Sequence, residues 1–273
     1  MVTALPRLKD FAKPATWSLA SVVLLAALAT PFSAHAQAPV PCNASLEVVR
    51  LAQPLTRVGH KLHTGEPITI VAMGSSSTWG SGATSQAASY PTQLAADLKA
   101  RFPKQSFNVI NAGVGGEEIP EMLKRFDTAV IAVKPDLVLW QLGTNSIMRD
   151  TKSSDQDSLI RDGLRRIRSI NSDVVLIDPQ YVPKVIAKPE AGRMVDLLAT
   201  TAKQLDVDLF PRFEAMKRWS VVEKLPFDQF TSVDGLHMND WGYACMAKGL
   251  GMALAEAAQR PVLSATAGAR ALP

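Results

Sequence analysis

The feature that most constrains the fold of this chain is an alternation of short apolar runs with longer amphipathic segments. The short runs are continuously apolar, as strands buried on both faces of a sheet are. The longer segments repeat their apolar residues with the period of helices that pack on a sheet. This order predicts a three-layer α/β/α sandwich with a central, mostly parallel sheet. The expected strands span residues 68–73, 107–111, 136–142, 173–178 and 207–210.

The amphipathic segments give the expected helices. The helix over 119–133 is expected to stop before Pro135, because proline disfavours a helical conformation in the residue that precedes it. The other helices are expected over 91–101, 159–170, near 190–204, over 211–224 and after Asp240.

A single domain accounts for this pattern. Hydrophobic residues make up 47% of the chain and charged residues 20%, which suits a sizeable core and argues against general disorder. No internal repeat and no Gly/Ser-rich linker divides the sequence. We therefore expect one domain over residues 37–273, with a core from about 43 to 260 and a frayed tail from Pro261.

The first residues have the order of a secretory signal. Arg7, Lys9 and Lys13 precede an apolar stretch over 17–28, and a small-x-small cleavage pattern ends at Ala36. The apolar stretch is shorter than the roughly 20 residues that span a bilayer. The sequence predicts a signal peptide over 1–36 and a periplasmic or secreted mature protein, with an uncleaved anchor as the alternative.

The charge balance argues against nucleic-acid binding. The formal net charge is +4, and the signal-like segment supplies a large part of it. No Lys/Arg run and no stripe of basic and aromatic residues follows, so nucleic acid is not an expected partner.

The chain has two cysteines, Cys42 and Cys245, and both follow the expected cleavage site. In an oxidising compartment such a pair is a disulfide candidate. Two separate buried thiols are the alternative. Neither cysteine lies near a histidine at the spacing of metal ligands, so no metal site is expected.

A serine-rich turn follows the first expected strand. Gly74 is followed by Ser75, Ser76, Ser77 and Thr78, a Gly-x-Ser-x-Thr pattern. Such a turn can present a serine hydroxyl together with outward-pointing backbone N–H groups. The register of the strand favours Ser76 as a nucleophile over its two serine neighbours. Taken alone, the pattern also fits an ordinary loop.

A candidate base lies near the end of the chain. An aspartate that accepts a hydrogen bond from imidazole Nδ1 leaves Nε2 free to take a serine proton. Asp234 and His237 have the spacing for this pairing, although an isolated Asp-x-x-His can also be a helix-capping pair. His60 and His63 lack a carboxylate-rich neighbourhood and are expected at the surface rather than at a metal.

Two further motifs can stabilise an oxyanion. The glycine-rich stretch over 111–116 follows the second strand and can expose a backbone N–H, with Gly116 favoured over Gly115 by register. Asn145 follows the third strand and offers a side-chain amide. The glycine stretch does not have the Gly-x-Gly-x-x-Gly pattern of a dinucleotide loop, so an ordinary strand-to-helix turn is its alternative.

These four motifs, in this order and spacing, are similar to the blocks of the SGNH hydrolase superfamily, also called GDSL esterases and lipases. The resemblance covers roughly residues 68 to 250 and implies the flavodoxin-like α/β/α fold of that superfamily. It implies that Ser76 is the nucleophile, His237 the base and Asp234 its orienting acid. It implies an oxyanion hole made by Ser76, Gly116 and Asn145. Two positions depart from the family pattern: Ser75 and Ser146 each stand where the family has aspartate.

The resemblance implies an exported serine ester hydrolase that works through an acyl-enzyme and needs no metal or organic cofactor. Short-chain or acetyl esters, including O-acetyl groups of carbohydrates, are the expected substrates. Trp79, Gln180 and Tyr181 are candidates to line the pocket, with packing as the alternative for Tyr181. An O-acyltransferase with the same site, or an inactive carbohydrate-binding protein of the same fold, are the alternative functions.

Overall fold

The continuously apolar runs form the strands of one parallel sheet. A computed structural model describes residues 40–261, in which five strands lie in the order β2-β1-β3-β4-β5. All neighbouring pairs are parallel, which confirms the predicted sheet. This is the strand order of flavodoxin-like doubly wound proteins. The strands are β1 (Ile68–Gly74), β2 (Phe107–Gly113), β3 (Leu137–Gln141), β4 (Asp173–Ile177) and β5 (Asp208–Phe210).

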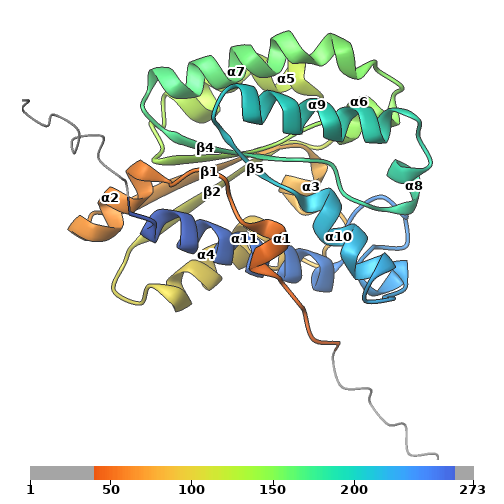
Figure 1. Cartoon of the computed structure of the whole chain (residues 1–273), viewed down its shortest axis with the longest axis horizontal. Helices are drawn as coiled ribbons and strands as arrows, with labels where there is room; N and C mark the ends of the chain where they lie inside the picture. The colour runs from red at the N-terminus through yellow and green to blue at the C-terminus, as the bar shows by residue number, and fades with distance from the viewer. Residues whose placement is uncertain (1–39, 262–273) are drawn as a thin grey trace, which may run out of the picture. The chain divides into compact units, whose positions relative to one another are not determined.

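Helices cover both faces of the sheet, as Figure 1 shows. On one face lie α5 (Ile119–Lys124), α6 (Thr144–Met148), α7 (Asp157–Ser169), α8 (Pro183–Ile186) and α9 (Glu190–Gln204). On the other lie α1 (Leu46–Val49), α2 (Thr56–Thr64), α4 (Tyr90–Arg101), α10 (Arg212–Val221) and α11 (Asp240–Gln259). The short α3 (Ser76–Trp79) follows β1 directly, and 3-10 turns occur at Gln86–Ala88, Ser153–Gln156 and Phe227–Gln229. The predicted three-layer α/β/α sandwich is confirmed.

The strand register places the chemical motifs at one edge of the sheet. Gly74 is paired with Gly113, so the serine turn and the glycine-rich stretch leave the sheet at the same level. Met73 is paired with Trp140, which brings the end of β3 alongside. The carboxyl ends of parallel strands converge on one crevice in such sheets. Segments distant in sequence therefore meet around α3.

One predicted helix is interrupted. The expected helix over 119–133 is α5 followed, after Arg125, by a π-helical segment at Asp127–Ile131. There the Ala132 N–H donates to the Asp127 carbonyl, five residues earlier. Buried Phe126 and Val130 keep nearly helical spacing across the break, so apolar periodicity does not reveal it.

The short helices α1, α2, α6 and α8 were not predicted from the sequence. Of these, α2 is attached through Asp173, whose Oδ2 accepts hydrogen bonds from the Arg57 and Val58 N–H groups, both at 3.0 Å. These bonds satisfy N–H groups at the start of α2 that have no partner within the helix. The carboxylate that secures the helix is more than 100 residues away in sequence.

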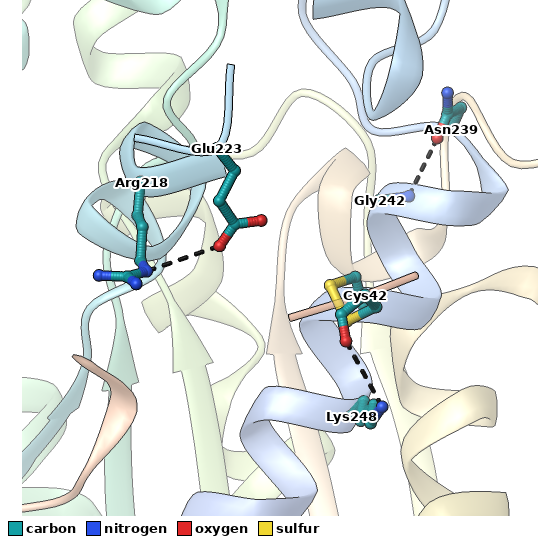
Figure 2. The surroundings of a disulfide bond; sticks show 7 residues. Cys42, Arg218, Glu223, Asn239, Gly242 and Lys248 are labelled. Atoms are coloured by element: carbon teal, nitrogen blue, oxygen red, sulfur yellow. Dashed lines mark hydrogen bonds and ion pairs between the residues drawn. A yellow bond between two sulfur atoms is a disulfide. The ribbon is translucent and has the colours of Figure 1, made fainter. Parts of the chain in front are cut away.

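The predicted disulfide between Cys42 and Cys245 is present, with a Cα–Cα distance of 5.4 Å. Cys245 is buried in α11, which begins at the Asn239 cap, and the Asn239 side chain accepts a hydrogen bond from the Gly242 N–H (Figure 2). Lys248 on the same helix donates to the Cys42 carbonyl. A bridge over 203 residues stabilises the fold by about 5 kcal/mol in the chain-entropy model.

The described residues from Cys42 onward form one compact unit. No helix within residues 40–261 is both long enough and apolar enough to cross a membrane. The predicted signal peptide over 1–36 lies outside the described residues, as does the predicted tail beyond Pro261. Both stay predictions.

Candidate active site

The serine turn exposes one of its three serines. Ser75 and Ser77 are each 1% exposed, whereas Ser76, the first residue of α3, is partly exposed. The Thr78 and Trp79 N–H groups both donate to the Ser75 carbonyl and close the turn. Of the three serines, only Ser76 is therefore accessible, and it is the serine that the strand register favours as a nucleophile.

Ser76, His237 and Asp234 form a continuous chain of hydrogen bonds. Ser76 Oγ lies 2.8 Å from His237 Nε2, and His237 Nδ1 lies 2.5 Å from Asp234 Oδ2. The ionised Asp234 carboxylate accepts a hydrogen bond from the Nδ1–H group, which leaves Nε2 as the acceptor for the serine hydroxyl hydrogen. The arrangement can transfer a proton from Ser76 to a histidine whose orientation is fixed.

The loop between Thr231 and Met238 holds Asp234 in its ionised form. Asp234 Oδ1 accepts hydrogen bonds from Ser232 Oγ at 2.6 Å and from the Leu236 and His237 N–H groups at 2.9 Å. Partial burial raises the pKa of the Asp234 carboxyl, but these hydrogen bonds outweigh burial and hold the pKa well below its ordinary value. The side chain that orients His237 is therefore an anion throughout the neutral range.

Two of the predicted oxyanion donors, Gly116 and Asn145, belong to segments that a hydrogen bond joins. Asn145 Nδ2 donates one hydrogen bond to the Glu117 carbonyl at 2.7 Å, which leaves its second amide hydrogen for another acceptor. Gly116 is exposed and has φ +80°, a conformation that favours glycine. Among the described residues, neither the Ser76 nor the Gly116 N–H donates a hydrogen bond within the protein. Both N–H groups are free for a ligand.

A model of the non-GDSL lipase-like family matches residues 41–260, which is most of the chain. The chain belongs to the non-GDSL lipase-like family. Membership in this family places it among the carboxylic ester hydrolases.

Related proteins agree with the family match. The chain is 22% identical to an acetylxylan esterase of Geobacillus stearothermophilus over 148 residues, which are 48% of this chain and 68% of that protein. A solved two-domain esterase active on acetylated mannans, co-crystallised with mannopentaose, aligns with a TM-score of 0.63 at 21% identity. That alignment covers 79% of this chain and 57% of the larger protein. A lipase/acylhydrolase of Enterococcus faecalis aligns with a TM-score of 0.57 at 22% identity, over 68% of this chain and 94% of that one.

These findings confirm the predicted relation to SGNH-type hydrolases, while the structural likenesses at such low identity bear on the fold alone. The name of the non-GDSL lipase-like family fits the first motif, in which Ser75 stands where GDSL proteins have aspartate. Ser75 is buried, and both its N–H and its Oγ donate to Gln141 Oε1, at 3.0 and 3.1 Å.

Gln141 was missed by the sequence prediction. It is the buried last residue of β3, and its Oε1 also accepts a hydrogen bond from Thr78 Oγ1 at 3.3 Å. A Cβ at Gly74 would lie 2.2 Å from Thr78 Oγ1 and 2.9 Å from Gln141 Oε1, so only glycine fits beside this cluster. In this non-GDSL lipase-like protein, the neutral amide oxygen of Gln141 thus fixes the serine turn by accepting hydrogen bonds from Ser75 and Thr78.

Two arginines that the sequence prediction also missed hold the glycine-rich loop. Arg125 pairs with both carboxylate oxygens of Glu117, at 2.9 and 2.8 Å from Nε, and its Nη2 donates to the Gly74 carbonyl at 3.2 Å. Arg149 donates from Nη2 to the Gly116 carbonyl and from Nη1 to Glu118 Oε1, both at 2.8 Å. The carbonyls just before the serine turn and at Gly116 are therefore tied to charged side chains.

Glu118 completes the attachment of this loop. Thr151 Oγ1 donates to Glu118 Oε2 at 3.0 Å, on the side of the carboxylate opposite Arg149. Partial burial raises the pKa of Glu118, but the hydrogen bonds from Arg149 and Thr151 outweigh it and lower the pKa overall. Glu118 and Glu121 also form a capping box at the start of α5, a local sequence signal that marks where this loop ends.

The three predicted pocket residues lie in different environments. Trp79 is 51% exposed and lies on α3 with Ser76. Gln180 is fully buried, accepts from Thr144 Oγ1 at 2.8 Å and donates to the Leu236 carbonyl at 3.0 Å, so it supports the loop before His237. Tyr181 packs edge-on against Phe213 with ring centroids 5.1 Å apart. This contact agrees with the expectation that Tyr181 packs in the fold, the alternative to a place in the pocket.

His60 and His63 are exposed on α2, as predicted. Within residues 40–261, no group of three or more His, Cys, Asp or Glu side chains is arranged to hold a metal ion.

Proposed function

We propose that this chain is an exported serine ester hydrolase that acts through an acyl-enzyme. The observation that carries the proposal is the hydrogen-bonded chain from Ser76 Oγ through His237 to Asp234, at 2.8 and 2.5 Å. A serine hydroxyl is a poor nucleophile unless a base within hydrogen-bond reach takes its proton. His237 Nε2 is that base, and Asp234 holds the ring in the required tautomer.

In the first half-reaction, Ser76 Oγ attacks the ester carbonyl while its proton passes to His237 Nε2. The carbonyl oxygen becomes an oxyanion and accepts hydrogen bonds from the Ser76 N–H, the Gly116 N–H and Asn145 Nδ2. Their free hydrogens are positioned before the reaction, which is why such donors lower the barrier. His237 then gives its proton to the departing alcohol as the carbon–oxygen bond breaks, leaving the acyl group on Ser76.

In the second half-reaction, water attacks the acyl carbonyl and gives a proton to His237 Nε2. Collapse of the second tetrahedral intermediate releases the carboxylic acid, and the proton returns to Ser76 Oγ. The same donors stabilise the second oxyanion.

We further propose that the substrates are short acyl esters on carbohydrates, acetyl esters foremost. The relatives named as esterases of acetylated xylan and acetylated mannan support this class. The Cys42–Cys245 disulfide supports export, because such bonds form and persist in oxidising compartments. Export would bring the protein to extracytoplasmic polysaccharides.

The test is active-site labelling of the purified protein with a fluorophosphonate, followed by peptide mass spectrometry. Modification is expected at Ser76, and it should be lost in His237→Ala, in which the serine has no base. Modification at Ser75 or Ser77 would refute the assigned nucleophile. An absence of labelling together with no hydrolysis of short-chain aryl esters would instead support a carbohydrate-binding protein.

Product analysis separates the hydrolase from the acyltransferase. The protein is incubated with an acetylated oligosaccharide and an excess of an unacetylated one, and the products are separated by mass. Free acetate as the main product supports the hydrolase, whereas acetyl groups on the added oligosaccharide would support transfer.

A further inference from the structure

Trp79 differs from the other tryptophans among the described residues. Trp140 and Trp219 are buried, and the ring centroid of Trp140 lies 5.1 Å from that of Phe126. Trp219 and Trp241 pack against each other at 5.3 Å. Within residues 40–261, Trp79 is the one exposed large aromatic side chain, and no ring contact is formed by its indole.

The backbone of Trp79 is fixed even though its ring is exposed. Its carbonyl accepts a hydrogen bond from Asn111 Nδ2 at 3.3 Å, and its N–H donates to the Ser75 carbonyl at 2.9 Å. A Cβ at Gly113 would lie 2.2 Å from the Trp79 nitrogen, so the end of β2 packs directly against this turn. The indole therefore projects from a rigid base, which reduces the entropy lost when a ligand binds to it.

Trp79 lies beside the nucleophile. Ser76 and Trp79 are the first and last residues of α3, and a spacing of three places side chains on neighbouring parts of a helical surface. Val114 is also exposed, at 44%, and its N–H donates to the Gly74 carbonyl at 3.0 Å, just before the serine turn. The backbone of exposed Val114 is thus attached to the residue that precedes the turn carrying Ser76 and Trp79.

Exposed apolar side chains that gather at one place mark binding surfaces. An exposed indole presents a flat apolar face, and the C–H groups on one face of a pyranose ring provide an apolar surface of matching shape. An acyl chain would instead favour an enclosed apolar pocket that removes it from water. The form of the surface fits a sugar ring better than an acyl chain.

We propose that Trp79, together with Val114, forms a stacking surface for the sugar ring that carries the ester. The proposal rests on the proposed function and deepens it, because it assigns the carbohydrate part of the substrate to a named surface. The indole contacts the sugar both before and during the reaction, so it contributes uniform binding. Loss of the ring should therefore raise KM for sugar esters much more than it lowers kcat.

The binding test uses the Ser76→Ala variant, which cannot form the acyl-enzyme. Acetylated xylo-oligosaccharides and manno-oligosaccharides are titrated while tryptophan fluorescence and heat of binding are recorded. Replacing Trp79 by Ala in this background should weaken binding of at least one of them tenfold or more, and Trp79→Phe should restore part of it. Val222→Ala, which removes another exposed apolar side chain, is the matched control.

The activity test compares kcat/KM for an acetylated oligosaccharide with kcat/KM for ethyl acetate, which has no ring. In Trp79→Ala the ratio of the two should fall tenfold or more, mostly through KM. An unchanged ratio with unchanged binding would overturn the proposal and leave the esterase intact. A selective loss on longer acyl chains, or a wild type that cleaves ethyl acetate but no sugar ester, would also overturn it. A wild type that cleaves neither ester refutes the proposed function itself.

Discussion

The starts of the strands, here called the amino edge of the sheet, and their ends, the carboxyl edge, carry similar residues in different roles. At the amino edge, Asp136, Asp173 and Asp208 lie at the starts of β3, β4 and β5. Asp136 accepts from Arg57 Nε at 2.7 Å, from Lys61 Nζ at 2.9 Å and from the Thr69 N–H at 2.9 Å. Each donor belongs to a fixed element, so these interactions only hold the fold together.

At the carboxyl edge the chain of interactions ends in a reactive group. Asp234 is as well supplied with donors as Asp136, and its hydrogen bonds also lower its pKa. Its partner His237 is hydrogen-bonded in turn to Ser76, which is partly exposed. In the mechanism that we propose, the Asp234 carboxylate can serve catalysis because the last group of its hydrogen-bond chain is partly exposed, whereas Asp136 is buried among its donors.

The largest effect should follow from removing the base. His237→Ala should lower kcat on the order of 10⁴-fold or more, because the serine proton then has no acceptor. Steady-state hydrolysis of a short aryl ester measures the loss, and thermal unfolding should show little change. His63→Ala on α2 is the matched control. If His237→Ala retained a tenth of the activity, the carboxyl edge would have no special role.

Removal of an oxyanion donor should have the next largest effect. Asn145→Ala should lower kcat about 10²-fold, with a smaller change in KM, because the donor acts on charge that develops in the transition state. Asn108→Ala, on the exposed side of β2, serves as the control. A rise in KM with normal kcat would show that Asn145 only binds substrate.

Arg149 tests whether ionic contacts at the carboxyl edge position the donors. Arg149→Met removes the bond to the Gly116 carbonyl and should lower kcat about tenfold by displacing the donor loop. Arg149→Lys should recover part of the loss, and Arg165→Met on α7 provides a control. A positioning role would be contradicted if kcat were normal in Arg149→Met. It would also be contradicted if Arg149→Lys lost as much kcat as Arg149→Met.

Asp136→Asn should affect stability and leave catalysis alone. The substitution leaves Arg57 and Lys61 without their carboxylate and should cost about 2 kcal/mol in the free energy of unfolding at neutral pH. Denaturant unfolding measures it, kcat/KM should stay unchanged, and exposed Asp196→Asn is the control. A large fall in kcat/KM of the folded variant would erase the contrast between the two edges.

The pH dependence of this variant sharpens the same point. Burial raises the pKa of Asp136, but hydrogen bonds from Lys61, Thr69 and Arg57 outweigh burial and lower it. Because the folded-state pKa is below the unfolded value of about 3.9, the stabilisation is present above that pH and is lost as the pH falls through the folded-state pKa. The difference in unfolding temperature between wild type and Asp136→Asn should therefore be largest near neutrality and shrink in strong acid.

The sequence predicted the sheet and the chemical motifs because both depend on local patterns. The core strands are continuously apolar, and the motifs follow directly where strands end. The supporting contacts are different in kind: Arg125 reaches Gly74 across 51 residues, and Arg149 reaches Gly116 across 33. No periodicity or spacing marks such pairs, because they are set by how helices dock on the sheet. The π-helical segment was not predicted for a related reason: its buried residues keep nearly the spacing of an α-helix, so the apolar pattern is unchanged.

The disulfide has a consequence for how the protein is made. Cys42 is synthesised 203 residues before Cys245, so the native disulfide cannot form until the chain has been made as far as Cys245. By then the strands and the loop that contains His237 have all been made. Closure of the bridge therefore comes late in biosynthesis, and an oxidised chain with its native pairing is one in which α11 has already met the segment that contains Cys42.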